Sequence, residues 1–153
     1  MTFLSEKTRH LEDLMPLIRE RLAAGQRVRY LPFRGVSMMP MLRQGIDSVV
    51  LSPIEGKLKK YDLPFYRRRD GQYVLHRIVK VGDRYTCCGD NQFAYEHNVR
   101  QEQLIAVVTG FYRDEAYYPV TCFRYKCYCR LWHWTRFTRH VYRWLCAKFK
   151  KVG

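Results

Sequence analysis

Short apolar segments separated by turn residues fill the middle of the chain, and their spacing restricts the fold more than any other feature. We expect strands at residues 27–32, 48–52, 62–66, 72–81, 84–88 and 103–113. Asp70-Gly71 is the strongest hairpin signal among the turns between them, and Pro64 indicates an edge strand or a bulge. Strands of this length, joined by such turns, predict a mostly β domain of antiparallel strands.

A helix is predicted before the first strand. Apolar residues recur there at helical spacing, and Gly25 follows as a stop: Leu11, Leu14, Met15, Ile18 and Leu22. Proline in the middle of a helix removes a backbone hydrogen bond. We therefore expect the helix to start effectively near Asp13 as its N-cap, with Pro16 in the first turn. Its apolar face should pack on the core.

The carboxyl-terminal segment is basic and aromatic. The chain has 28 Lys and Arg against 14 Asp and Glu, a formal charge of +14, and no acidic residue follows Glu115. On a helical projection one face carries Leu131, Trp134, Phe137, Val141, Trp144, Leu145 and Phe149, and the other carries Arg136, Arg139, Arg143 and Lys150. This face either packs on the core or binds an anionic membrane surface, and nucleic acid ranks below the membrane as a partner.

These segments divide the chain into three parts: an amino-terminal helix at residues 1–26, a β domain at 27–120 and a basic tail at 121–153. No apolar run is long enough for a spanning helix, and the charged start does not resemble a secretory signal. We therefore expect the protein in the cytoplasm or on the inner face of the membrane. The six cysteines lack zinc-site spacing, so we expect reduced thiols and no metal or cofactor.

A candidate catalytic group lies in the turn Phe33-Arg34-Gly35-Val36-Ser37-Met38-Met39-Pro40. A serine hydroxyl becomes a nucleophile only when a base takes its proton. His76 is the candidate base, and Asp90 the candidate carboxylate that orients it, with Asp83 a weaker competitor. Arg77 is interpreted as one half of a structural ion pair with an internal carboxylate. Each of these residues alone is more often structural than catalytic.

Their order along the chain, however, resembles that of type I signal peptidases. The matching segments are Gly35-Val36-Ser37-Met38-Met39-Pro40, Asp47-Ser48-Val49-Val50, Lys60-Tyr61-Asp62-Leu63, Leu75-His76-Arg77-Ile78-Val79, Gly89-Asp90-Asn91 and Ile105-Ala106-Val107-Val108. The resemblance runs from about Val28 to Arg113. It implies the signal peptidase/LexA-like β fold, with residues 27–120 as the catalytic domain.

The resemblance also implies roles for single residues. Ser37 would be the nucleophile and His76 the general base, as in the endoplasmic-reticulum-type branch, with Asp90 as orienting group. The backbone amides of Gly35 and Ser37 would form the oxyanion hole, and Met38 and Pro40 would contact substrate. The expected activity is serine endopeptidase cleavage of a leader or signal-type peptide after a small residue, by acyl transfer.

Two alternatives remain open. A non-catalytic basic module that binds an anionic membrane or nucleic acid would explain the charge of +14 and the aromatic tail. A self-cleaving repressor of the LexA type shares the fold, but that group has Lys where His76 stands and carries a DNA-binding domain first. The roughly thirty residues before Val28 are too few for such a domain, so this alternative ranks lowest.

Overall fold

The computed structural model describes residues 1–5, 11–32 and 35–149. Phe33 and Arg34 of the serine turn and Lys150 of the tail lie outside this range. The helices are α1 (Leu11–Ala23), α2 (Phe123–Trp134) and α3 (Arg136–Phe149), with a short 3-10 helix, η1 (Gln101–Gln103). The strands are β1 (Thr2–Ser5), β2 (Val28–Leu31), β3 (Ser48–Ser52), β4 (Pro64–Arg67), β5 (Tyr73–Leu75), β6 (Arg77–Lys80), β7 (Tyr85–Cys88), β8 (Glu96–Val99), β9 (Leu104–Arg113) and β10 (Ala116–Pro119).

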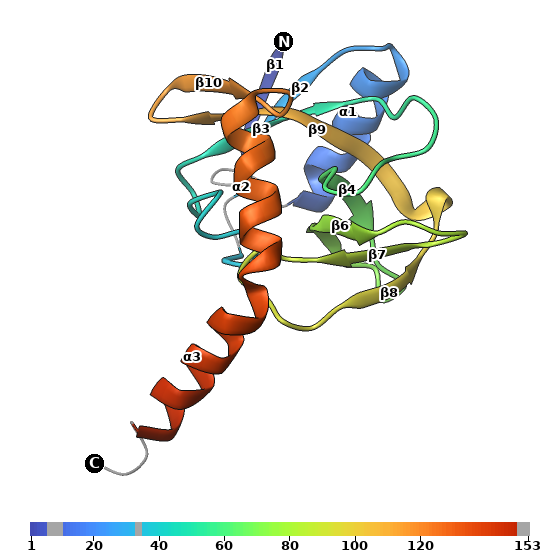
Figure 1. Ribbon diagram of the computed structural model, residues 1–153. Helices are drawn as coiled ribbons and strands as arrows, with labels where there is room; N and C mark the ends of the chain where they lie inside the picture. The colour runs from blue at the N-terminus through green and yellow to red at the C-terminus, as the bar shows by residue number, and fades with distance from the viewer. Residues whose placement is uncertain (6–10, 33–34, 150–153) are drawn as a thin grey trace.

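Two sheets form the body of the protein (Figure 1). The larger has the order β1-β2-β3-β9-β4-β5, with β10 also paired to β9, and the smaller has the order β6-β7-β8. All described pairs are antiparallel except β1 with β2. Bulges on both sides of β9 increase the twist, and the larger sheet curls. The predicted mostly β architecture of antiparallel strands is confirmed at this level.

The main core lies between the larger sheet and the helices α1 and α2. Helix α1 buries the face that its periodicity predicts, formed by Leu14, Met15, Ile18 and Leu22. The predicted start near Asp13 is wrong, since the helix begins at Leu11 and Pro16 lies inside it. Pro16 cannot donate a backbone hydrogen bond to the first turn of α1. Leu11, in that turn, packs against the core.

The strand predicted at residues 72–81 is in fact two strands that belong to different sheets. β5 pairs with β4 in the larger sheet, and β6 pairs with β7 in the smaller one. The other edge of β6 is occupied, because Ile78 exchanges backbone hydrogen bonds with Tyr61 and Asp62. The backbone therefore changes partners at His76, which stands at the junction of the sheets rather than in mid-strand.

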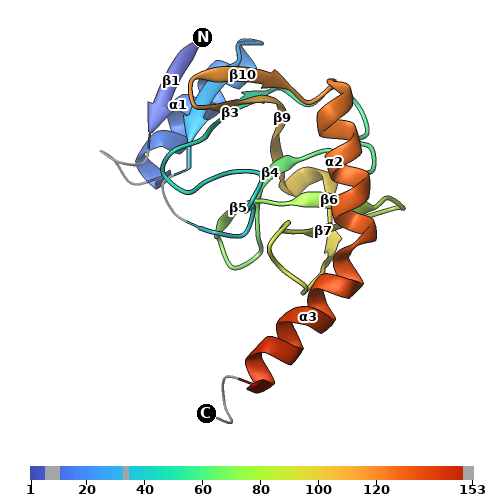
Figure 2. The same cartoon turned by 60° about the vertical axis from the view of Figure 1, so that its left-hand side comes forward.

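The basic tail is two helices with different surroundings. Helix α2 lies against the body and buries Tyr125 and Cys129, whereas α3 extends away from it in both views (Figures 1 and 2). The α2 helix ends at Thr135, where the Thr135 amide donates to Leu131. In the described part of the chain, neither these helices nor α1 combine the length and apolar character that a membrane crossing requires.

Truncation of the α1 face should destabilise the whole domain. Ile18 is fully buried in the main core, so Ile18→Ala removes contacts and leaves a cavity. We expect the free energy of unfolding to fall by about 2–5 kcal/mol, measured by urea denaturation. Glu20→Ala on the exposed face of the same helix serves as control and should stay within about 0.5 kcal/mol of wild type. Equal effects of the two substitutions would contradict the packing of α1.

Candidate active site

The Ser37 turn is fixed on one side by the core. Gly35 has φ +102°, a backbone conformation that residues with a side chain rarely adopt. The Met38 side chain is buried, and Arg113 donates to the carbonyls of Pro40 (2.6 Å) and Met41 (2.8 Å). Met38 is therefore a core residue, with little side-chain surface left for the substrate contact predicted for it. The Pro40 side of the turn remains exposed.

On the other side, residues 89–91 hold Ser37 directly. The Asn91 amide donates to the Ser37 carbonyl at 2.8 Å, and the Asn91 side chain donates to the Val36 carbonyl at 3.2 Å. A Cβ atom on Gly89 would lie 2.6 Å from the Ser37 carbonyl oxygen and 3.0 Å from the Ser37 Cβ. Only glycine allows this approach, so Gly89 brings the two backbone segments into contact.

His76 and Gly89 lie just beyond the same end of the β6–β7 ladder. Arg77 pairs with Cys88 there, and His76 precedes Arg77 while Gly89 follows Cys88. The candidate base and the residue that touches Ser37 are thus each one residue from the same strand pair. No hydrogen bond of the described residues joins the Ser37 hydroxyl to His76. Catalytic contacts of this kind often tighten only when substrate binds.

The carboxylate partner of His76 is Glu96, which the sequence analysis missed. Nδ1 of His76 lies 2.6 Å from Oε1 of Glu96, and the His76 side chain is almost completely buried. The N–H is not aligned for a linear hydrogen bond, but the two polar groups are in close contact. Glu96 also accepts hydrogen bonds from the Tyr66 hydroxyl (2.8 Å) and from both Nε and Nη2 of Arg68.

These partners keep Glu96 ionised. Burial alone raises the pKa of Glu96, but contacts with His76, Arg68 and Tyr66 outweigh burial and hold its pKa well below the ordinary 4.5. The result is a fixed negative charge beside Nδ1 of His76. Such a charge favours the tautomer with hydrogen on Nδ1 and leaves Nε2 free to accept a proton.

Asp90 has a different partner. Its carboxylate binds Arg77 in a bidentate pair, with Nε to Oδ1 at 2.8 Å and Nη2 to Oδ2 at 2.7 Å, and both side chains are buried. Tyr128 donates to the same carboxylate, and Trp132 donates to the Asp90 carbonyl. The structural ion pair predicted for Arg77 is confirmed. The expectation that Asp90 orients His76 is not met, because Arg77 takes its carboxylate.

Further contacts surround this pair. Arg77 also donates to the Tyr125 hydroxyl at 2.8 Å and contacts Sδ of Met41 at 2.9 Å. Its side chain thereby links α2 to the residues that follow the Ser37 turn. Asp83, the weaker competitor for the role of orienting His76, is exposed in the turn between β6 and β7. It lines a cleft, described below, that includes neither Ser37 nor His76.

The backbone amides of Gly35 and Ser37 are predicted to form the oxyanion hole. Neither the Gly35 amide nor the Ser37 amide donates in any hydrogen bond of the described residues. An oxyanion hole needs such donors with no competing acceptor. The two amides predicted for this role therefore remain candidates.

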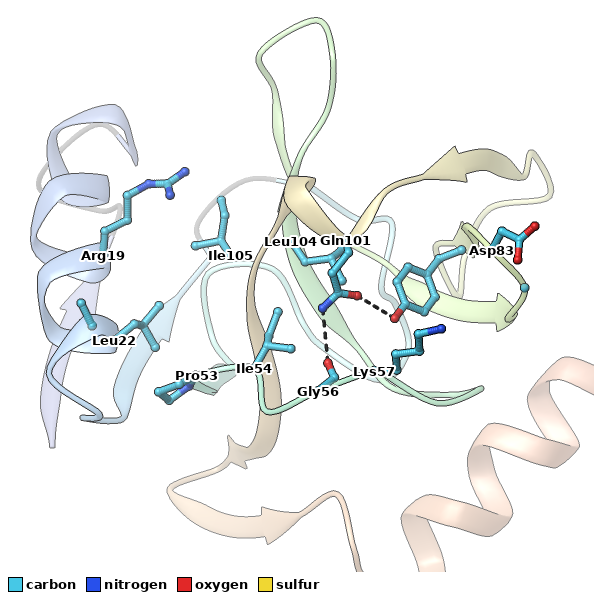
Figure 3. Close-up of a pocket in the computed structure, with 13 residues that line it drawn as sticks. Arg19, Leu22, Pro53, Ile54, Gly56, Lys57, Asp83, Gln101, Leu104 and Ile105 are labelled. Atoms are coloured by element: carbon cyan, nitrogen blue, oxygen red, sulfur yellow. Dashed lines mark hydrogen bonds between the residues drawn. The ribbon is translucent and has the colours of Figure 1, made fainter.

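A cleft of about 760 Å³ lies elsewhere on the body (Figure 3). Leu22, Ile54 and Ile105 line it with apolar surface. Gln101 bridges its wall by donating to the Gly56 carbonyl and accepting from the Tyr85 hydroxyl. Neither Ser37 nor His76 contributes to its lining, so it is not part of the candidate active site.

The cysteines differ in their exposure, and Cys87, the one opposite Glu96 in the β7–β8 ladder, is buried. All six are unpaired. Burial, with the nearby Glu96, raises the pKa of the Cys87 thiol to about 12, which keeps it protonated and unreactive. In the ranges that the structure describes, no three His, Cys, Asp or Glu side chains are grouped to hold a metal ion.

No family model matches this chain, and neither the curated proteins nor the solved structures include one similar to it. The function is therefore argued from the geometry of the site.

Removal of the Asp90 charge should unfold the domain more readily. Asp90→Asn leaves the Arg77 guanidinium buried without its counter-ion, which costs about 3–5 kcal/mol of unfolding free energy. Asp83→Asn, at an exposed turn carboxylate, should change it by less than about 0.5 kcal/mol. Urea denaturation at neutral pH measures both. A loss for Asp90→Asn as small as that for Asp83→Asn would contradict the role of the pair.

Glu96 should make stability depend on pH in the acid range. Because folding lowers its pKa, Glu96 contributes stability that is complete above its ordinary pKa of 4.5 and is lost as the pH falls further. Wild type should therefore be more stable than Glu96→Gln at neutral pH, and the difference should shrink on acidification. Thermal unfolding at a series of pH values tests this. A difference that stays constant through the acid range would exclude the assigned contacts.

Proposed function

We propose that the protein is a serine endopeptidase of the type I signal peptidase kind, in the branch that uses a Ser/His pair. The observation that carries the proposal is the contact of Gly89 with Ser37, combined with the pairing of Arg77 with Cys88, the residues next to His76 and Gly89. The buried carboxylate of Glu96 beside Nδ1 of His76 supports it. Curled antiparallel sheets agree with the signal peptidase/LexA-like fold that the sequence resemblance implies.

The proposed reaction is acyl transfer. His76 Nε2 takes the proton of the Ser37 hydroxyl as Oγ attacks the peptide carbonyl, and the Gly35 and Ser37 amides bind the oxyanion that forms. His76 then gives its proton to the departing amine and an ester remains on Ser37. Water, deprotonated by His76, hydrolyses this ester and restores the enzyme. No metal or cofactor enters any step.

Glu96 would act as the positioning residue for His76. Its negative charge stabilises the imidazolium that forms when His76 takes a proton, and its contact with Nδ1 holds the ring orientation. In this proposal Glu96 has the role that the resemblance implied for Asp90. Asp90 instead supports the site through Arg77.

The proposed substrate is a leader or signal-type segment of a peptide or protein, cut after a small residue. Val36 and Met39 are exposed on either side of Ser37, so they, rather than Met38, offer apolar surface to a bound peptide. The proposed place of action is the cytoplasm or the inner face of the membrane.

Proteolysis of leader-type peptides tests this function. The purified protein is incubated with a library of peptides that place small residues at varied positions, and products are identified by mass spectrometry. Ser37→Ala and His76→Ala should each lower the cleavage rate by at least about 10³-fold, and Glu96→Gln by about 10²–10⁴-fold. His97→Ala removes an exposed histidine on β8 and should leave the rate unchanged.

Circular dichroism shows whether each variant is folded. Cleavage by Ser37→Ala at the wild-type rate, or no cleavage of any peptide by wild type, would exclude the proposed activity. Equal losses in His76→Ala and His97→Ala would exclude His76 as the base.

A further inference from the structure

Two arginines near the start of α3, Arg136 and Arg139, turn toward the protein. Nη2 of Arg136 contacts Sγ of Cys88 at 2.6 Å and donates to the Gln92 carbonyl. The Arg139 guanidinium lies 3.6 Å from the centre of the Trp132 ring. The two Arg136 contacts place the start of α3 beside the end of β7 and the residues that follow it. Amphipathic helices on soluble domains normally do the reverse and pack their apolar side inward.

Apolar side chains of α3 and of the end of α2 point to solvent. The side chains of Trp134, Phe137 and Trp144 are 81%, 76% and 58% exposed. Together with further exposed residues at helical spacing they form one row, which we call the apolar row: Leu131, Trp134, Phe137, Val141, Trp144 and Leu145. An exposed row of large apolar side chains usually marks an interaction surface.

The charge around the apolar row indicates an anionic partner. Residues 121–153 contain nine Lys and Arg and no Asp or Glu. Lys126, Arg130 and Lys148 are exposed along α2 and α3, and Lys148 lies 5.3 Å from the centre of the Trp144 ring. Aromatic side chains flanked by cations are typical of helices at the surface of anionic bilayers.

Two other partners fit this surface less well. A second copy of the chain would bring two purely cationic helices together, which like-charge repulsion opposes. A nucleic acid would need side chains that stack on its bases. In the apolar row, Leu131, Val141 and Leu145 are aliphatic and cannot stack.

We infer that α3 and the end of α2 form a docking surface for the anionic face of a lipid bilayer. The helix lies in the plane of the membrane, with the apolar row at the boundary of headgroups and acyl chains and the flanking cations on the lipid phosphates. The inference does not depend on the proposed peptidase activity. The docking surface nevertheless has a consequence for the proposed activity. Helix α3 lies beside residues 89–91, which hold Ser37, so membrane docking would bring that site to the bilayer.

Vesicle co-sedimentation of the full chain tests the docking surface. Vesicles contain phosphatidylcholine alone or phosphatidylcholine with phosphatidylglycerol. Wild type should bind the anionic vesicles more tightly than the neutral ones, and added salt should weaken this binding. The double variant Phe137→Glu/Trp144→Glu should bind them at least about tenfold more weakly. Val81→Glu, at an exposed apolar residue between β6 and β7, is the matched control and should bind like wild type.

Tryptophan fluorescence gives a second readout that needs no variant. Insertion of the apolar row should shift the emission of wild type to shorter wavelength on addition of anionic vesicles. Absence of wild-type binding, an unshifted emission, or equal binding by the double variant would overturn the inference. Wild type that fails to bind vesicles but self-associates, or binds DNA, would also overturn it if the double variant loses that self-association or DNA binding.

Discussion

The buried pair of Arg77 and Asp90 is the interaction on which the rest of the structure depends. Arg77 follows His76 directly, and Asp90 follows Gly89, the residue in contact with Ser37. Two buried charges lower stability unless their geometry is good and their remaining hydrogen-bonding groups are satisfied. Here the pair is bidentate, and further contacts come from Tyr125, Tyr128 and other residues around it. The requirement to neutralise Arg77 thus fixes the backbone on both sides of the candidate site.

The same requirement explains the division of the tail. Helix α2 supplies the side chains that enclose the ion pair, so it packs on the body and buries Tyr125 and Cys129. Helix α3 follows it after a bend and extends away from the body (Figures 1 and 2). Arg136 contacts Cys88 and Gln92 at the end of β7 and after it, and the apolar side chains described along α3 are exposed. Because α2 packs on the body to enclose Arg77, the basic, aromatic helix α3 is left exposed to solvent.

Much of the scaffold could be predicted from local patterns. The face of α1, the strands at residues 48–52 and 103–113 and the ion pair of Arg77 follow from periodicity and from the cost of burying a charge. The break at His76 could not be predicted, because residues 73–80 are strand-forming throughout and only tertiary pairing divides them. Strand β8 carries the sequence Glu-His-Asn-Val, which has no alternation of apolar and polar residues, so its pairing with β7 gave no local signal.

Because strand β8 was not predicted, Asp90 rather than Glu96 was expected beside His76. A hairpin formed by the strands predicted at residues 72–81 and 84–88 would bring Asp90 close to His76. Arg77, however, is a stronger competitor for the Asp90 carboxylate, since a buried guanidinium must be neutralised. Glu96 comes opposite Cys87 only through the β7–β8 pairing and so reaches His76 from the other side. The orientation of α3 is likewise tertiary, because a helical projection identifies an apolar face without showing which face meets the protein.

Site mapping with a serine-directed probe tests the central claim most directly. The folded protein is treated with a fluorophosphonate, and the modified peptide is identified by mass spectrometry. The account predicts a single adduct on Ser37, which His76→Ala abolishes and His97→Ala leaves in place. An adduct on another residue, or labelling of Ser37 that persists in His76→Ala at the wild-type rate, would contradict it.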